Sequence, residues 1–195
     1  MSEQSPAHHV RDLRVQVGGA DCVPDKLFGW IPRFTNMEKM LLFGDGWAAS
    51  SLRPSLWRLP QSITSLTINT NVFTFVQVWD IMTQLPNLAD LSLSGSRAST
   101  HESVSPETGK PQRGRFGGRL LLRGGYASKD VMDALLEIPA GLRFTEVAIF
   151  CGRDLLLSAV SLVEACSKTL VKLSQSVYFL SKSPPLLPVK LVRRF

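Results

Sequence analysis

Residues 59–68 read LPQSITSLTI and residues 85–95 read LPNLADLSLSG, and both stretches space their apolar residues in the same way. The spacing is apolar-x-x-apolar-x-apolar, which the first stretch fills with Ile63, Leu66 and Ile68. Alternation of apolar and polar positions is typical of a strand with one buried face. A proline near the start of each stretch marks a turn before that strand. The two stretches therefore predict two strands of one kind.

The same pattern occurs seven times along the chain. Its middle position falls at Leu13, Met40, Leu66, Leu91, Leu120, Val147 and Leu173. The intervals between these positions are 27, 26, 25, 29, 27 and 26 residues. Self-similarity at a nearly fixed period indicates a repeat architecture, in which each unit buries its apolar face against its neighbours. Two units depart from the pattern, because Gly117 fills the first apolar position of the fifth and Gln175 the last position of the seventh.

Segments with helical spacing of apolar residues lie between the predicted strands. They are Thr74–Leu85, Ser128–Ile138 and the shorter Ser158–Cys166 and Lys26–Phe34. Ser128 or Asp130 is placed to cap the second of these helices. Each unit thus predicts a strand, a connection and a helix within about 26 residues.

The two quoted stretches resemble leucine-rich repeats of the irregular, 26-residue kind, as in the repeat regions of fungal F-box proteins and their relatives. The resemblance covers roughly residues 8–180. It implies an α/β solenoid, a horseshoe of about seven strand–loop–helix units with a parallel sheet on the concave face. It also implies a protein-interaction module, acting as a substrate-recognition domain in an F-box-type ubiquitin-ligase system. No F-box-like segment precedes the repeats, so docking to a ligase scaffold is not carried over.

The chain divides into three parts on this interpretation. Residues 1–9 form an N-terminal tail, residues 10–180 the repeat domain, and residues 181–195 a basic, proline-containing tail. Residues 98–115 are polar and lack apolar periodicity, which predicts a flexible inserted loop. Because no terminal caps are recognisable, a fragment of a longer protein, or a truncated remnant without a partner, is an open alternative.

Composition indicates a globular protein that does not cross a membrane. Of the 195 residues, 44% are hydrophobic and 19% charged, and the net charge is +6. The three cysteines form neither a disulfide framework nor a CxxC metal site, and no signal sequence is recognisable, which favours the cytoplasm or nucleus. Apolar stretches fall short of the roughly 18 residues that a membrane-spanning helix needs.

Motifs for catalysis or cofactor binding are not found in the sequence. It has no GxGxxG, no phosphate-binding P-loop and no GxSxG. His8, His9 and His101 lack further ligands at zinc-site spacing. Cys151 and Cys166 are expected to be small buried hydrophobic residues. We therefore expect a non-enzymatic protein with no catalytic residue, metal, cofactor or small-molecule substrate.

Candidate binding residues follow from the strand pattern, because alternate side chains of each strand point away from the core. Most of these outward residues are small or polar, and seven long basic or apolar ones stand out. They are Lys39, Leu41, Phe43, Arg119, Leu121, Arg123 and Phe150. Aromatic and arginine side chains are the types that anchor protein interfaces. We expect the concave face to bind an acidic or mixed protein segment, unless loops cover Phe43 and Phe150.

A rival interpretation is a nucleic-acid or anionic-surface binder. It would use Arg113, Arg115, Arg119, Arg123 and the C-terminal basic residues, and its binding would weaken steeply with salt. Aromatic residues do not interleave with these basic residues as stacking platforms for bases would. Nucleic acid is therefore the less favoured partner.

Overall fold

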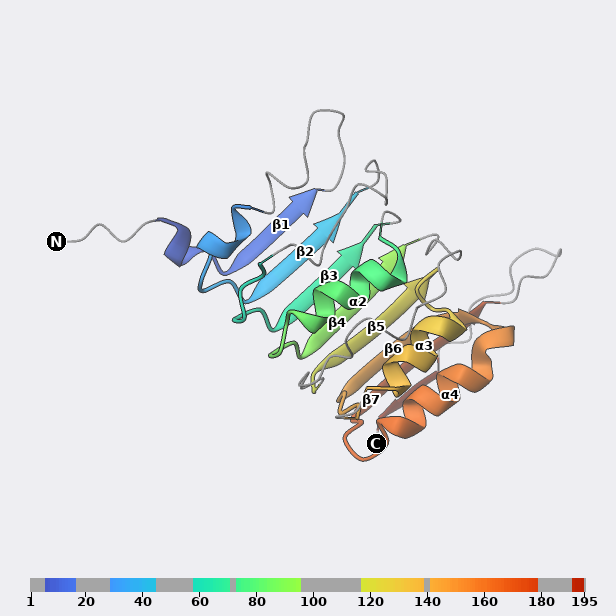
Figure 1. Cartoon of the computed structure of the whole chain (residues 1–195). Coiled ribbons are helices and arrows are strands. Elements are labelled where there is room, and N and C mark those ends of the chain that lie inside the picture. Colours follow the sequence, from blue (N-terminus) through green and yellow to red (C-terminus); the bar gives the residue numbers. More distant parts are fainter. Residues whose placement is uncertain are drawn as a thin grey trace.

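The protein, seen in a computed structural model, has one eight-stranded sheet with α-helices packed on one of its faces (Figure 1). The structure describes residues 6–16, 29–44, 58–70, 73–95, 117–138, 141–178 and 191–194. Within these ranges the strands lie side by side in the order of the sequence. Strands β1 to β7 are all parallel, and β8 is antiparallel to β7.

The elements are as follows. The strands are β1 (Asp12–Gln16), β2 (Lys39–Phe43), β3 (Ser65–Asn69), β4 (Asp90–Gly95), β5 (Arg119–Gly124), β6 (Glu146–Gly152), β7 (Lys172–Tyr178) and β8 (Leu191–Arg194). The α-helices are α2 (Phe75–Thr83), α3 (Lys129–Leu136) and α4 (Leu156–Ala165), and short 3₁₀ helices are η1 (Pro6–His9), η2 (Ile31–Arg33) and η5 (Arg153–Leu155).

All seven predicted strands form, and their middle residues are paired in register. Leu66 of β3 pairs with Met40 of β2 on one side and with Leu91 of β4 on the other. The same register continues through Leu120, Val147 and Leu173. The predicted α/β organisation with a parallel sheet is therefore confirmed. Each interval of 25–29 residues is long enough for the chain to return and begin the next strand in the same direction.

One backbone arrangement repeats at the start of the strands. The carbonyl of Glu38 accepts hydrogen bonds from the amides of Thr64 and Ser65, at 2.9 and 3.1 Å. The same two-donor arrangement joins the carbonyl of Arg11 to residues 38–39, of Thr64 to residues 89–90, of Gly118 to residues 145–146 and of Thr145 to residues 171–172. Five of the six junctions between successive strands β1 to β7 are thus formed by equivalent main-chain atoms.

The exception lies between β4 and β5, which are separated by the longest interval. Here, among the described residues, the carbonyl of Ala89 accepts from the amide of Gly118 alone, at 3.2 Å. The amide of Arg119 instead donates to Oδ1 of Asp90, at 2.7 Å. The Asp90 carboxylate therefore replaces a main-chain acceptor at the place where the repeat is least regular.

Helices α2 and α3 begin where a side chain satisfies one of their free amides. Thr74 caps α2 with a reciprocal capping box, in which its hydroxyl accepts from the Gln77 amide and the Gln77 side chain accepts from the Thr74 amide. Ser128 caps α3 by accepting from the Val131 amide at 3.4 Å. Of the two predicted caps, Ser128 is the one used.

Two other predicted helices differ in the structure, one in where it begins and the other in the kind of helix that its described residues form. Helix α4 begins at Leu156, two residues before the predicted start at Ser158. The described part of the predicted helix 26–34 is only the 3₁₀ turn η2. Proline cannot donate the i to i−4 hydrogen bond, and Pro32 lies in the middle of this turn. In residues 29–34 the apolar spacing therefore reflects Ile31, which is buried, and Phe34, which packs against the core, rather than an α-helix.

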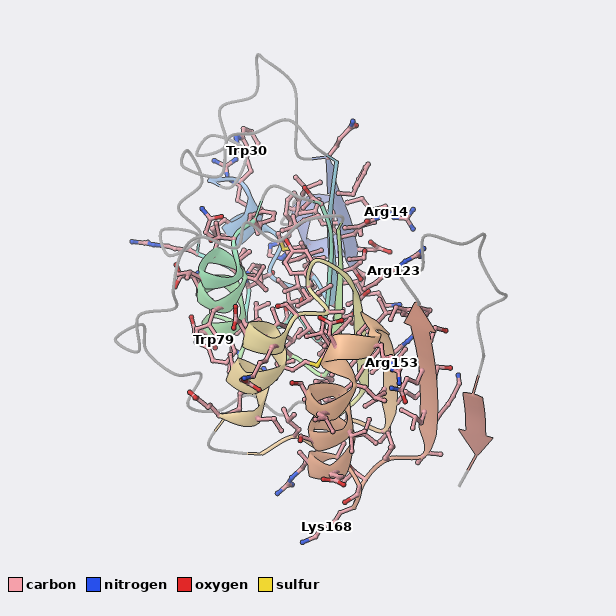
Figure 2. The ribbon with its side chains drawn as sticks, turned by 90° about the vertical axis from the view of Figure 1, so that its right-hand side faces the viewer. Arg14, Trp30, Trp79, Arg123, Arg153 and Lys168 are labelled. Carbon is pink, nitrogen blue, oxygen red and sulfur yellow. The ribbon has the colours of Figure 1, made fainter. Side chains whose placement is uncertain are left out.

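The core fills the space between the helices and the sheet face beneath them (Figure 2). Inward strand residues such as Leu66, Ile68 and Leu122 are fully buried. Tyr126, after β5, is also fully buried, and its hydroxyl donates to the carbonyls of Phe73 at 3.0 Å and Thr70 at 3.2 Å. This side chain ties the chain after β5 to the chain after β3.

Parts of the predicted tails are ordered elements. Residues 6–9 form η1, and residues 191–194 form β8 on the edge of β7. The predicted inserted loop, residues 98–115, lies outside the described residues.

Candidate functional site

The candidate site is the face of β1–β7 that points away from α2, α3 and α4, which we call the open face. Figure 2 shows Arg14 and Arg123 on this side of the sheet and Trp79 on the helix side. Because the register is regular, outward residues align in three rows across the strands. The first row is Asp12, Lys39, Ser65, Asp90, Arg119, Glu146 and Lys172; the second is Arg14, Leu41, Thr67, Ser92, Leu121, Ala148 and Ser174; the third is Gln16, Phe43, Asn69, Ser94, Arg123, Phe150 and Ser176.

All seven predicted binding residues lie on the open face, in two separate patches. The β2 patch consists of Lys39, Leu41 and Phe43. The β5–β6 patch consists of Arg119, Leu121, Arg123 and Phe150. Strands β3 and β4 lie between the patches. Neighbouring strands are about 4.8 Å apart, so β2 and β5 are separated by about 14 Å.

The apolar members of both patches are partly exposed. Leu41, Phe43, Leu121 and Phe150 are each half-buried, whereas the inward neighbour Leu42 is fully buried. Burial of apolar surface is the main source of binding free energy, and these side chains still have apolar surface to bury.

Arg123 and Phe150 are the two predicted residues that the structure brings into direct contact. They are register partners on β5 and β6, and the Arg123 guanidinium carbon lies 5.8 Å from the centroid of the Phe150 ring. This distance is within the range of a cation–π interaction. The arginine therefore covers part of the ring but keeps its own charge exposed to solvent.

Charges on the open face are unevenly distributed among the rows. All three acidic residues, Asp12, Asp90 and Glu146, are in the first row, where they alternate with basic residues. Nζ of Lys172 lies 3.4 Å from Oε2 of Glu146, and Nε of Arg14 lies 3.9 Å from Oδ1 of Asp12. With five basic and three acidic residues, the open face has a net charge of +2. The first row contains three acidic and three basic residues, so its charges balance one another.

The second and third rows carry positive charge alone. Their charged residues are Arg14, beside Leu41, and Arg123, beside Phe150. The apolar side chains of each patch thus have one arginine beside them in a row that contains no carboxylate. This arrangement favours a partner that supplies apolar side chains together with negative charge.

A strip of short polar side chains separates the two patches. It consists of Ser65, Thr67, Asn69, Ser92 and Ser94 on β3 and β4. The Ser94 hydroxyl donates to Oδ1 of Asn69 at 3.0 Å. Hydroxyl and amide groups both donate and accept, so this strip can hydrogen-bond to the main chain of a bound segment.

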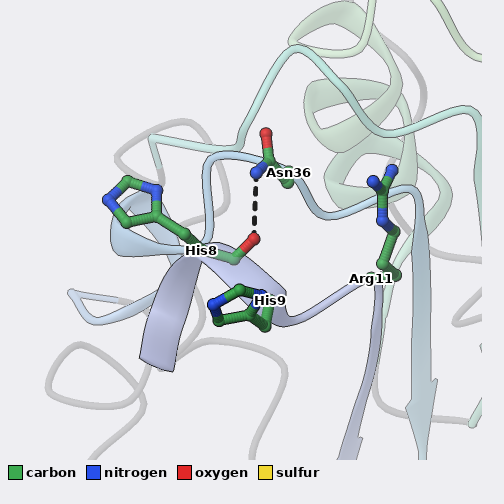
Figure 3. A pocket seen from close by; sticks show the side chains of 4 residues that line it. All are labelled: His8, His9, Arg11 and Asn36. Carbon is green, nitrogen blue, oxygen red and sulfur yellow. Dashed lines mark hydrogen bonds between the residues drawn. The ribbon is translucent and has the colours of Figure 1, made fainter. Parts of the chain in front are cut away.

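A pocket that the sequence did not predict lies near the N-terminus (Figure 3). It is an open pocket of about 310 Å³ lined by His8, His9, Arg11 and Asn36. Most of its polar groups already contact neighbours. The Asn36 amide donates to the His8 carbonyl at 2.9 Å, Nδ1 of His8 lies 3.0 Å from the Thr35 hydroxyl, and Arg11 pairs with Glu38. These contacts attach η1 to the turn before β2.

The described cysteines are core residues. Cys151 and Cys166 are buried, as predicted, and burial raises the pKa of both thiols. For Cys151 the nearby Asp154 carboxylate raises the pKa further. Thiols with a raised pKa stay protonated and are poor nucleophiles.

Two observations concern other kinds of function. In the described ranges, no group of three or more His, Cys, Asp and Glu side chains is arranged to hold a metal ion. None of the helices in the same ranges is long and apolar enough to cross a membrane.

Comparison of the chain with protein-family models, with curated proteins and with solved structures finds no match.

Proposed function

We propose that the chain is a leucine-rich-repeat solenoid that acts as a non-enzymatic protein-interaction module through its open face. The repeat interpretation is supported by the seven equivalent strands and by the two-donor hydrogen bonds that join successive units at Arg11, Glu38, Thr64, Gly118 and Thr145. By resemblance, the module would recognise substrates in an F-box-type ubiquitin-ligase system.

One observation carries the binding proposal: partly exposed apolar side chains lie beside arginines in rows without carboxylates. Leu41, Phe43, Leu121 and Phe150 occupy outward positions and are partly exposed, so a partner can bury their remaining apolar surface. An acidic or mixed protein segment is the partner that this surface fits best. A phosphate backbone is a poorer fit, because a net charge of +2 over seven strands does not form a continuous basic track.

The test is partner capture from cells with the tagged full chain and two charge-matched variants. The first variant combines Arg119→Glu with Arg123→Glu on the open face. The control combines Lys129→Glu with Lys168→Glu, which makes the same change of charge at exposed positions of α3 and of the turn after α4. We expect the open-face variant, and separately Phe43→Ala, to lose proteins that the wild type and the control both retain.

Equal capture by all the variants contradicts the open face as the binding surface. Capture that disappears after nuclease treatment would favour the nucleic-acid alternative, and Arg113 and Arg115, which lie outside the described residues, would then need to be tested. Thermal unfolding of each variant shows that a loss of capture is not a loss of fold.

The solenoid part of the proposal has a separate test. Units of a solenoid contact mainly their neighbours, so an array tolerates an added unit. Duplicating residues 65–89 in tandem should give a folded monomer with a steeper denaturant dependence of the free energy of unfolding, because more surface is exposed on unfolding. An aggregated or unfolded product contradicts the solenoid.

A further inference from the structure

We propose that the open face recognises an extended acidic segment that crosses the strands and places one apolar side chain on each patch. This inference rests on the proposed protein-binding function and specifies the conformation and residue spacing of the partner. The binding residues fall into two patches rather than one, and the distance between the patches sets the spacing.

The distance follows from the strand order. Leu41 and Leu121 are in the second row on β2 and β5, three strand spacings or about 14 Å apart. Phe43 and Phe150 are in the third row on β2 and β6, four spacings or about 19 Å apart. A bound segment must therefore place two apolar side chains about 14–19 Å apart on one side of its chain.

An extended chain meets this requirement at even spacings. It rises by about 3.3 Å per residue, and alternate side chains point to the same side. Side chains four residues apart are then separated by about 13 Å, and side chains six residues apart by about 20 Å. Spacings of three or five place the two side chains on opposite sides. Binding should consequently depend on whether the spacing is even or odd.

The polar strip between the patches favours an extended segment over a helix. An extended segment has free main-chain N–H and C=O groups, whereas those of a helix are already paired within the helix. Thr67, Ser92 and the other short side chains on β3 and β4 offer donors and acceptors along the crossing path. A helix with apolar residues eleven positions apart also separates them by about 16 Å. Its main-chain groups are already paired, however, so they would not form hydrogen bonds with the polar strip.

The charges determine the flanking residues of the partner. Arg14 lies on β1, outside the β2 patch, and Arg123 lies within the β5–β6 patch. An acidic residue next to each apolar residue of the partner would meet one of these two arginines. Nε of Arg14 already lies 3.9 Å from Oδ1 of Asp12, so the acidic residue of the partner would share this arginine with Asp12.

The probes are synthetic peptides blocked at both ends, with the sequence Glu-Phe-Ser-Thr-Ser-Phe-Glu as the parent. In the parent the two phenylalanines are four residues apart, and lengthening or shortening the serine–threonine spacer gives spacings of two to six. Binding is followed by NMR chemical shifts of the full chain labelled with ¹⁵N. We expect spacings of four and six to bind about tenfold more tightly than three and five, with shifts at Thr67 and Ser92.

Three further measurements complete the test. A peptide with lysine in place of both glutamates should bind about tenfold more weakly than the parent. The variant Arg14→Glu with Arg123→Glu should reverse this order, whereas Lys129→Glu with Lys168→Glu should leave it unchanged. A proline in the spacer, which excludes a helix, should leave binding within about twofold of the parent.

Two outcomes overturn the inference. One is equal binding at even and odd spacings, and the other is tighter binding of a helical peptide with phenylalanines eleven residues apart. If either occurs while partner capture still depends on Arg119 and Arg123, only the extended mode is wrong and the proposed function stands. If capture is also insensitive to the open face, the proposed function itself is wrong.

Discussion

Arg123 on β5 and Phe150 on β6 are register partners, and the arginine guanidinium lies over the phenylalanine ring at 5.8 Å from its centroid. An exposed cation–π pair contributes about 0.5–1 kcal/mol at most. We therefore expect a double-mutant cycle with Arg123→Gln and Phe150→Leu to give a coupling free energy of about 0.5 kcal/mol in urea unfolding. A coupling above about 2 kcal/mol would mean that the pair stabilises the fold, so that binding losses in Arg123 variants could not be interpreted.

The variant Tyr126→Phe should destabilise the protein by about 0.5–1.5 kcal/mol, because it removes a buried hydroxyl that donates to two main-chain carbonyls. These are the carbonyls of Thr70 and Phe73, at 3.2 and 3.0 Å from the tyrosine hydroxyl. The ring is retained, so the change in core volume is small. Urea unfolding measures the effect, and a loss below about 0.5 kcal/mol would show that other donors replace the hydroxyl.

Two glycines with similar backbone conformations should respond differently to alanine. Gly124 and Gly141 have φ angles of +66° and +69°, which are unfavourable for a side chain. A Cβ at Gly124 would lie 1.9 Å from the carbonyl oxygen of Gly95, whereas a Cβ at Gly141 would meet nothing within 4 Å. Gly141→Ala should cost about 1–2 kcal/mol, and Gly124→Ala substantially more. Similar losses of stability in the two variants would contradict the close approach of β5 to β4.

Stability should fall at alkaline pH because of the buried thiols. Burial raises the pKa of Cys151 and Cys166 from 9.0, so the folded protein holds these protons more tightly than the unfolded chain does. Their contribution is complete below about pH 9 and is lost as the pH rises through the folded-state pKa. Tyr126, whose pKa is also raised by burial, adds the same trend above its ordinary value of 10.0.

The check on the pH effect is urea unfolding at several pH values between 8 and 10 under reducing conditions. The double variant Cys151→Ala with Cys166→Ala should have a smaller decline of the unfolding free energy over this range than the wild type. An identical decline in the two proteins would assign the pH effect to other groups.

The two sides of α4 offer a direct comparison. Leu162 is fully buried, whereas 82% of the Leu157 surface is exposed. Leu162→Ala should cost about 2–5 kcal/mol, and Leu157→Ala should change stability by less than about 0.5 kcal/mol. Thermal and urea unfolding of the two variants provide the measurement. A large loss for Leu157→Ala would mean that this side of α4 is covered in solution.

The sequence determined the repeating part of the fold, because that part depends on local alternation. Positions such as Leu66 and Ile68 recur at intervals of 25–29 residues, and this regularity predicted seven strands and the side chains that point outward. The outward residues Leu41, Phe43, Leu121 and Phe150 were found in this way and lie on the open face.

Tertiary structure decided the contacts between parts of the chain that are far apart in the sequence. Tyr126 satisfies carbonyls 53 and 56 residues away, and Asp90 accepts the amide of Arg119 where the longest interval interrupts the repeated hydrogen bonds. The contact between Arg123 and Phe150 likewise required the register of β5 and β6. Periodicity reveals which face a side chain occupies, but hydrogen bonds and side-chain contacts between units form only when separate units are brought together in space.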